Sequence, residues 1–301
     1  MKEKKSLGIM TYIDSSKKML EDFSWLYKSW IYSGCWRTSD LIVVHHPEIT
    51  EKLPKEAGVV LIPCLPTSHT DPLFKDYHFI NSIGCLTGDE VSKVARHYDY
   101  LLRTDADVFL TKNLASFKPN FPVHGRGNYY FSDDFKKNML LFCEKHRVKH
   151  HHRFGCGHSI MASSELVIDF LQRQLHWSRV LMQEFGTDPA NWGEWPHWCR
   201  GVTTMYAAEI TANERWGDFL QNGRERILDI ESNNEQDIDT LTLHIHGVHT
   251  TDYFSKFDYR DGKYDYISPD ILDKNKINQY CHWICMSSIE DIKAEAGYLP
   301  N

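Results

Sequence analysis

The sequence predicts an α/β protein in which a mostly parallel central sheet is flanked by helices. In the first third of the chain, short apolar runs alternate with amphipathic stretches, which is the pattern of βαβ units. No internal repeat or low-complexity tract interrupts the chain. Its 301 residues, of which 42% are hydrophobic, are enough to bury a substantial core. We therefore expect a single domain over residues 1–301.

Four strands are expected in the first half of the chain, at residues 7–12, 40–45, 58–63 and 98–103. Between the first two, apolar residues recur at helical spacing over residues 15–32. Ser15 or Ser16 can cap the start of this segment, because a serine hydroxyl accepts from a free backbone N–H of the first turn. The segment is therefore expected to be a helix packed on the sheet.

A second helix is expected over residues 75–97, where Gly84 and Gly88 suggest that it is broken or kinked. Further along, the pattern loosens into a loop with a short strand at 119–134, helices at 164–174 and 201–213, and a polar linker at 231–239.

Composition and charge exclude several classes of function. The formal net charge of −7 argues against nucleic acid as a partner, because binding a phosphate backbone requires clustered positive charge. No apolar run approaches the roughly 20 residues needed to span a bilayer, and the segment after the N-terminal MKEKK is too polar for a signal peptide. The eight cysteines lack the dense spacing of a disulfide scaffold, so reduced thiols are expected. A cytoplasmic protein without a membrane span is expected.

A pair of carboxylates follows the fourth expected strand. Asp105 and Asp107 are separated by one residue, at the position where open α/β sheets place ligand groups. Such triplets are frequent in surface loops, but this one is followed by an apolar Val-Phe-Leu run that makes unpaired charges costly. Both carboxylates can reach one Mg²⁺ or Mn²⁺, whose coordination shell a diphosphate can complete.

The segment 98–110, YDYLLRTDADVFL, resembles the DxD signature of glycosyltransferases with the GT-A fold. The resemblance extends, at lower similarity, over most of the chain. It implies a GT-A, Rossmann-like sheet with a nucleotide-sugar half at 1–115 and an acceptor half at 116–301. It also implies a nucleotide-sugar donor, UDP being the commoner nucleotide, bound by Thr11 and Tyr12 on the first strand and by Arg103 and Asp105.

A second resemblance lies near the C-terminus, where His244-Ile-His-Gly fits the H-x-x-G pattern that supplies a late metal ligand in several GT-A families. A neutral imidazole can complete a carboxylate-rich manganese site. The Lys-Pro-Trp that often follows is absent, so His246 and His249 compete with His244. In a strand, His244 and His246 share one face. An ordinary half-buried strand with polar alternation is the open alternative.

The segment 154–163, FGCGHSIMAS, resembles the small-residue strand beneath the donor sugar in GT-A enzymes. The resemblance implies donor contacts from Gly155, Gly157 and His158, with the glycines allowing close approach of the ligand. A zinc site is the alternative, formed by His146, His150, His151, His152, Cys156 and His158. These residues lack the paired framework of zinc ligands, so a solvated basic loop that contacts phosphate or acceptor is expected instead.

An inverting transfer needs a catalytic base that takes the proton of the acceptor hydroxyl. Two glutamates are candidates for this base. Glu194 lies among tryptophans in NWGEWPHW, which superficially resembles acceptor loops of inverting galactosyltransferases. Glu209 falls on an otherwise apolar helix face, where a salt bridge with Arg200 or Arg215 is the favoured alternative. The acidic pair at 133–134 is a third possibility, and a retaining transfer requires no such base.

Taken with the resemblance, these residues predict a metal-dependent glycosyltransferase that uses Mn²⁺ or Mg²⁺ and moves a sugar from a nucleotide-sugar donor to a glycan or glycoprotein acceptor. The chain resembles anchor-less cytosolic enzymes of bacteria and large algal viruses, which favours UDP-xylose as donor. The alternatives are a sugar nucleotidyltransferase and a catalytically inactive carbohydrate-binding relative. A dehydrogenase or P-loop enzyme is excluded, because the chain lacks both glycine-rich motifs.

Overall fold

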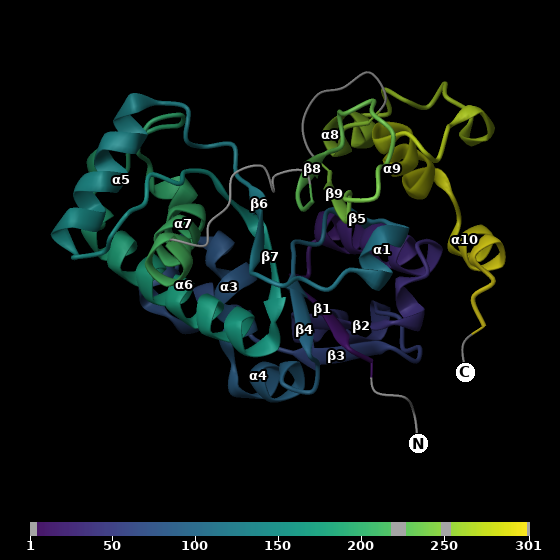
Figure 1. Ribbon diagram of the computed structural model, residues 1–301, viewed down its shortest axis with the longest axis horizontal. Coiled ribbons are helices and arrows are strands. Elements are labelled where there is room, and N and C mark those ends of the chain that lie inside the picture. The colour runs from purple at the N-terminus through teal and green to yellow at the C-terminus, as the bar shows by residue number, and fades with distance from the viewer. Residues whose placement is uncertain (1–4, 218–226, 248–253, 300–301) are drawn as a thin grey trace.

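The computed structural model describes residues 5–217, 227–247 and 254–299. A six-stranded sheet crosses the centre of the molecule in the order β3-β2-β1-β4-β7-β6 (Figure 1). Its strands are β1 (Leu7–Ile13), β2 (Ser39–His45), β3 (Val59–Pro63), β4 (Tyr100–Arg103), β6 (Val123–Arg126) and β7 (Cys156–Ser163). Of these six strands only β7 runs opposite to the others. The predicted α/β class with a mostly parallel sheet is confirmed.

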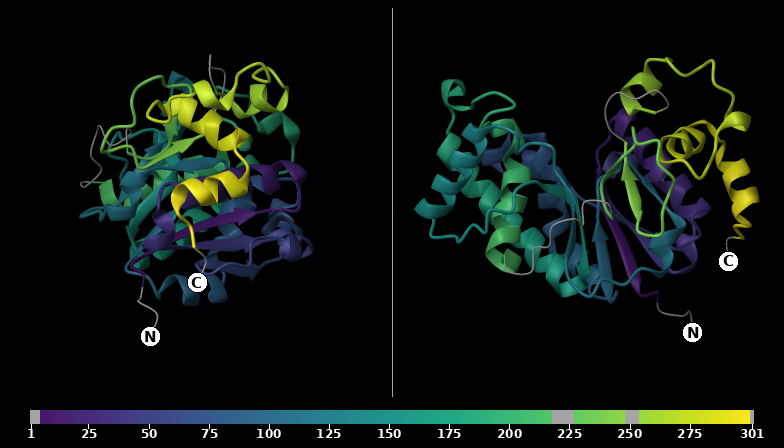
Figure 2. Two further views of the ribbon diagram at one scale, coloured as in Figure 1. Left: turned by 90° about the vertical axis from the view of Figure 1, so that its right-hand side faces the viewer. Right: turned by 45° about the horizontal axis from the view of Figure 1, so that its top comes forward.

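Helices lie on both sides of the sheet. On one side α1 (Lys17–Tyr32) packs against α9 (Ile277–Met286) and α10 (Ile289–Ala296), and α5 (Asp133–Lys145), α6 (Ser164–Phe185) and α7 (Thr203–Trp216) lie on the opposite side (Figures 1 and 2). The shorter helices are α2 (Thr67–Thr70), α3 (Asn81–Gly84), α4 (Asp89–Ala95) and α8 (Lys256–Arg260). Among the described residues, no helix combines the length and the apolarity needed to cross a membrane.

The two faces of the sheet bury separate cores. Ile9 and Ile13 of β1 join the core formed with α1, whereas Met10 and Tyr12 join the core on the other face, with α3, α4 and α6. This alternation follows from the pleat of a strand, in which successive side chains point to opposite faces. Because both faces are covered, the strands read as continuous apolar runs.

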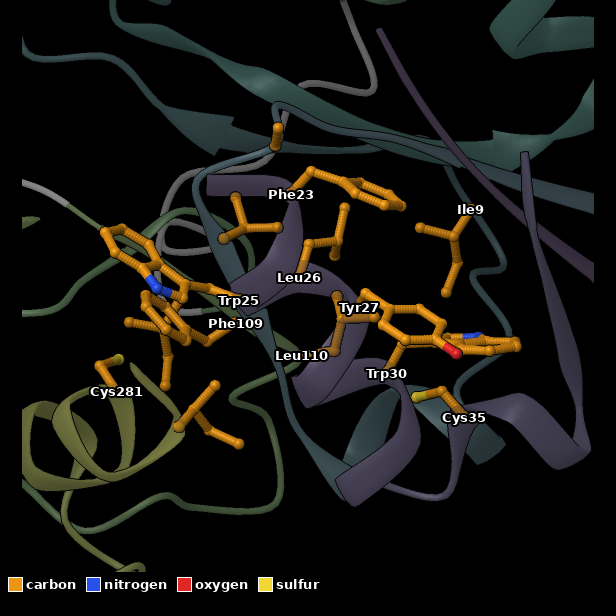
Figure 3. Close-up of a cluster of buried hydrophobic side chains, with 14 of the residues drawn as sticks. Ile9, Phe23, Trp25, Leu26, Tyr27, Trp30, Cys35, Phe109, Leu110 and Cys281 are labelled. Carbon is orange, nitrogen blue, oxygen red and sulfur yellow. The ribbon is translucent and has the colours of Figure 1, made fainter. Parts of the chain in front are cut away.

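A smaller sheet of three strands stands beside the large one. It consists of β5 (Val108–Leu110), β9 (His244–His246) and β8 (Ile230–Glu231), in the order β5-β9-β8. The Ser29 hydroxyl of α1 accepts from the Leu110 N–H at 2.9 Å, and the ring of Trp25 stacks on that of Phe109 with centroids 6.0 Å apart (Figure 3). Helix α1 therefore holds β5, and with it the end of the Asp-x-Asp segment, against the core.

Most predicted elements are confirmed with shifted ends. The four early strands and the short strand at 123–126 are present, Ser16 caps α1 through the Met19 N–H at 3.2 Å, and α6 continues to Phe185. The single helix predicted over 75–97 is wrong. The chain there forms two 3-10 turns, His78–Ile80 and Cys85–Thr87, together with the short helices α3 and α4.

The two glycines of this segment have different roles. A Cβ on Gly84 would lie 2.3 Å from the Thr67 hydroxyl, so this backbone packs directly on the turn after β3. Gly88 then takes an extended conformation, with φ −64° and ψ 154°, before α4 begins. Of the two predicted breakpoints, Gly84 stays helical, with φ −61° and ψ −40°, and only Gly88 interrupts the helical backbone.

Candidate metal centre

Three side chains meet at the carboxyl end of β4. Asp105 and Asp107 follow this strand directly, and His246 ends β9; one ligand atom from each lies within 4.8 Å of the others. Val108 pairs with His246 in the small sheet, which brings the His246 Nε2 to 3.2 Å from the Asp107 Oδ2. Two carboxylates and one imidazole form an oxygen-rich set that suits Mn²⁺ or Mg²⁺. Among the described residues this is the one group of its kind.

The carboxylate of Asp105 is oriented by a buried arginine. Arg103 is 1% exposed, and its Nη2 donates to the Asp105 Oδ1 at 2.9 Å and to the Ser82 carbonyl at 3.1 Å, while Nη1 donates to the His158 carbonyl. The His158 Nδ1 lies 3.5 Å from the other Asp105 oxygen. Burial opposes ionisation, but the charges of Arg103 and His158 hold the pKa of Asp105 below its ordinary value. Asp105 is therefore ionised, as a metal ligand must be.

The carboxylate of Asp107 has two cationic neighbours. The Lys256 ammonium donates to its Oδ2, the oxygen that His246 also contacts. Against the effect of burial, His246 and Lys256 hold the pKa of Asp107 well below its ordinary value. Burial likewise opposes the charge on His246, but Asp107 raises the pKa of this imidazole to about 9. A divalent cation must compete with Lys256 and with the His246 proton for the same oxygen.

Lys256 is held in place by α8, the helix that it begins. Arg260 of α8 donates from Nε to the Glu21 Oε2 and from Nη2 to the Asp22 Oδ1, both at 2.6 Å. Its guanidinium also lies 5.2 Å from the centroid of the Trp25 ring. Burial, together with the charge of Asp107, raises the pKa of Asp22 to about 6. Helix α8 is thereby fixed to α1, and α1 in turn supports β5.

His244 lies close by but has other partners. It is fully buried; its Nδ1 accepts from the Asp229 N–H at 3.2 Å, and its Nε2 lies 3.5 Å from the Thr104 hydroxyl. Burial lowers its pKa, so the ring is neutral. The preference for His244 as the late ligand is therefore corrected: the structure brings His246 to the carboxylate pair. His249 lies outside the described residues.

Sequence reasoning missed Asp229, a buried carboxylate beside this site. Its backbone is left-handed, with φ 54°, and its oxygens accept from the Ser159 N–H at 3.1 Å and the Ser159 hydroxyl at 2.6 Å. A Cβ on Gly157 would lie 2.5 Å from its Oδ2, and one on Gly125 only 1.7 Å away. Gly157 therefore makes room for Asp229, and not for a ligand as its motif implied. The sequence signal that could have revealed Asp229 is a single acidic residue within the apolar run Ile-Leu-Asp-Ile.

Glu209 is buried in a hydrogen-bond network away from solvent. Its carboxylate accepts from the Gly155 N–H at 2.6 Å, from the Tyr129 hydroxyl at 2.9 Å and lies 3.2 Å from the His150 Nε2. Gly155 has φ 86°, and the bond from its N–H fixes the approach to β7. Neither predicted arginine is the partner: Arg215 pairs with Asp169 and Arg200 stacks on Trp192. This placement fits a structural role and not that of a base.

The histidines predicted as a solvated loop are partly buried. The His150 side chain is 2% exposed against Glu209, and the His146 Nε2 contacts Glu184 at 2.5 Å. In the part of the chain that the structure describes, they join no metal-binding group. The zinc interpretation gains no support, and the loop is less solvated than expected.

Glu194 lies exposed in the loop between α6 and α7, next to Trp195, whose side chain is 55% exposed. The loop is docked on the start of α5, where Asp134 accepts from the Trp198 N–H at 2.9 Å and the Ser132 hydroxyl donates to the Pro196 carbonyl at 3.0 Å. No contact within residues 5–217, 227–247 and 254–299 joins Glu194 to the three clustered ligands. The loop offers exposed aromatic surface on the side of α5 to α7.

The end of β1 carries polar atoms without protein partners. The hydroxyls of Thr11 and Tyr12 are buried and find no hydrogen bond among the described residues, and the same holds for the Nε2 of His45 at the end of β2. Burial raises the pKa of Tyr12, so its hydroxyl keeps its proton. A buried polar atom without a partner costs about 1–3 kcal/mol. A polar ligand at this edge of the sheet would remove that cost.

Comparison with known proteins identifies a family but no curated relative. No curated protein matches the sequence. A family described as a domain of unknown function, DUF7164, matches residues 1–296, which is nearly the whole chain. The protein therefore belongs to the DUF7164 family.

Proposed function

We propose that this protein is a metal-dependent glycosyltransferase of the GT-A type, which transfers a sugar from a nucleotide-sugar donor to a hydroxyl group of a glycan or glycoprotein. The observation that carries the proposal is the cluster of Asp105, Asp107 and His246 at the carboxyl end of β4. In open α/β sheets, ligands bind outside the carboxyl ends of the strands. The donor set suits Mn²⁺ or Mg²⁺ and leaves positions for two phosphate oxygens.

Residues around the cluster have separate tasks in this proposal. The cation, when bound, neutralises charge on the departing nucleoside diphosphate. Arg103 keeps Asp105 ionised and oriented through its 2.9 Å hydrogen bond. His158, whose side chain is 29% exposed beside Asp105, can contact the donor. The unpartnered Tyr12 hydroxyl at the end of β1 can bond the nucleoside.

The acceptor is expected on the side of α5 to α7. Exposed aromatic side chains gather there, among them Trp195 at 55% and Phe131 at 59% exposure. Flat apolar rings with polar edges suit the faces of sugars. Within the nucleotide sugars, UDP-linked donors are the first choice and UDP-xylose the first candidate, with residues 1–115 binding the nucleotide and 116–301 the acceptor.

The proposal is tested by thermal unfolding with UDP, in the presence of Mn²⁺ or of a chelator. A diphosphate and two carboxylates repel each other without the cation, so UDP should stabilise the protein only when Mn²⁺ is present. At a hundredfold excess over Kd, the gain is about 2.7 kcal/mol. Asp107→Asn should abolish the effect, whereas Asp133→Asn, at a fully exposed carboxylate, should leave it unchanged.

A panel of nucleotide sugars then identifies the donor by Mn²⁺-dependent release of the nucleoside diphosphate. Release of inorganic pyrophosphate from a nucleoside triphosphate and a sugar phosphate would point instead to a nucleotidyltransferase. Equal stabilisation by UDP with and without chelator would contradict the metal bridge, and with it the proposal.

A further inference from the structure

Two cysteines that the proposed function does not use lie together at the carboxyl edge of the large sheet. Cys64 follows β3, and Cys85 begins the 3-10 turn after α3. Their sulfur atoms contact the same carbonyl oxygen, that of Leu65, at 3.3 and 3.7 Å. Each thiol also perturbs the pKa of the other, and the Thr67 hydroxyl lies 3.6 Å from the Cys85 sulfur. The two thiols thus lie close together in the fold, although twenty residues separate them in the sequence.

One member of this pair differs from the remaining six cysteines in access, and the other differs in ionisation. Cys64 is half-buried, whereas the other seven are buried. The neighbouring Cys64 thiol, acting against burial, lowers the pKa of Cys85 to about 7. Burial raises the pKa of Cys35 and Cys143 to about 12 and that of Cys281 far above its ordinary value. A thiolate, and not a thiol, is the reactive form.

We propose that Cys64 and Cys85 are a redox-sensitive pair, which a hydroperoxide converts to a reversible disulfide. The Cys85 thiolate attacks the peroxide O–O bond, giving a sulfenic acid and releasing hydroxide, or an alcohol from an organic peroxide. The Cys64 sulfur then attacks the sulfenic sulfur, the S–S bond forms, and the hydroxyl leaves as water with the thiol proton. Two thiols are oxidised and one hydrogen peroxide is reduced to two waters.

The bond would join two segments that border the proposed donor site. Tyr12, which the proposed function places at the donor site, lies beside the Cys85 sulfur atom. The Ser82 carbonyl, in α3 just before Cys85, accepts from Arg103, the residue that orients Asp105. A covalent link between the turn after β3 and the end of α3 therefore constrains the support of the site. The chemistry of the pair itself does not depend on the proposed function.

The experiment treats the whole protein with graded hydrogen peroxide at neutral pH, blocks free thiols with N-ethylmaleimide, and maps peptides without reduction. The expected result is a cross-linked peptide pair containing Cys64 and Cys85, two hydrogen atoms lighter than the sum of the parts. Alkylation of the two residues should fall together, and dithiothreitol should restore it. Cys281 and Cys285, one helical turn apart and buried, serve as the internal control and should not cross-link.

The variant Cys64→Ser tests the order of the steps. It should leave Cys85 as a sulfenic acid that dimedone traps, because the resolving sulfur is gone, and circular dichroism verifies its fold. Sulfinic acid at either residue of the wild-type protein without a cross-linked peptide would overturn the proposal. Equal loss of alkylation at all eight cysteines would overturn it too, because the selectivity argued from access and ionisation would be absent.

Discussion

Replacing Lys256 by methionine should tighten the binding of Mn²⁺ in the absence of any nucleotide. The Lys256 ammonium donates to the Asp107 Oδ2, one of the oxygens proposed as a metal ligand. Burial opposes its charge, but Asp107 raises the pKa of Lys256, so the side chain is charged at neutral pH. Methionine keeps most of the apolar stem while removing the ammonium. The cation then loses both a competitor and a source of repulsion.

The size of the effect follows from burial and charge. Side-chain exposures of 18% for Lys256 and 11% for Asp107 place the pair between surface and interior. Two unit charges about 4 Å apart interact with about 4 kcal/mol at an effective dielectric constant of about 20, which is an upper bound. In the wild-type protein Mn²⁺ takes the place of the Lys256 ammonium beside Asp107. Removing the ammonium therefore recovers only part of that energy. We expect a gain of roughly 1.4 to 2.8 kcal/mol, or about 10- to 100-fold in affinity.

Isothermal titration of Mn²⁺ into both proteins at pH 7.5 measures this difference. Lys263→Met is the matched control, because Lys263 pairs with Asp258 at 2.5 Å and carries the same charge just beyond α8. The variant at Lys256 should also melt at a lower temperature without cation, since Asp107 loses its partner, and regain stability when Mn²⁺ is added. Unchanged or weaker Mn²⁺ affinity in Lys256→Met would refute the competition, and so would an equal gain in the control.

Three further predictions concern the neighbouring residues. His246→Ala should lose Mn²⁺ affinity while His244→Ala retains most of it, and the reverse order in a Mn²⁺ titration would contradict the ligand assignment. Gly157→Ala should lower the free energy of unfolding in urea by about 1–3 kcal/mol, because its Cβ meets a buried carboxylate, whereas Gly201→Ala, which faces open space, should cost far less. Burial lowers the pKa of His282 to about 4, so the unfolded chain, with an ordinary value near 6.5, takes up the proton first. Stability should therefore fall by up to about 3 kcal/mol between pH 6.5 and 4, and His282→Phe should flatten this slope in urea unfolding.

The elements that the sequence predicted well are those whose pattern is local. The early strands are covered on both faces, so each is a continuous apolar run between polar turns. Asp105 and Asp107 were found because they interrupt such a pattern at its end. Helix α9 was not predicted, because Ile277–Met286 is buried nearly all round and shows little polar face.

The parts that escaped prediction depend on contacts between distant segments. Strand alternation puts His244 and His246 on one face but does not tell which of them reaches the carboxylates. The pairing of Val108 with His246 decides that, and pairing register is not visible in either segment alone. The role of Gly157 likewise depends on Asp229, which accepts from the adjacent Ser159 across 70 residues of sequence.

The pairing of β5 with β9 has a consequence for the order of assembly. A ribosome delivers the two aspartates first, whereas the imidazole that completes the ligand set and the strand that covers β5 emerge only after a long intervening stretch of chain. The ammonium of Lys256, 149 residues beyond its carboxylate, arrives later still. Nascent or truncated chains thus carry an incomplete ligand set and an unpaired strand edge, which is prone to association. Cation uptake by this protein therefore reports that β9 has paired with β5.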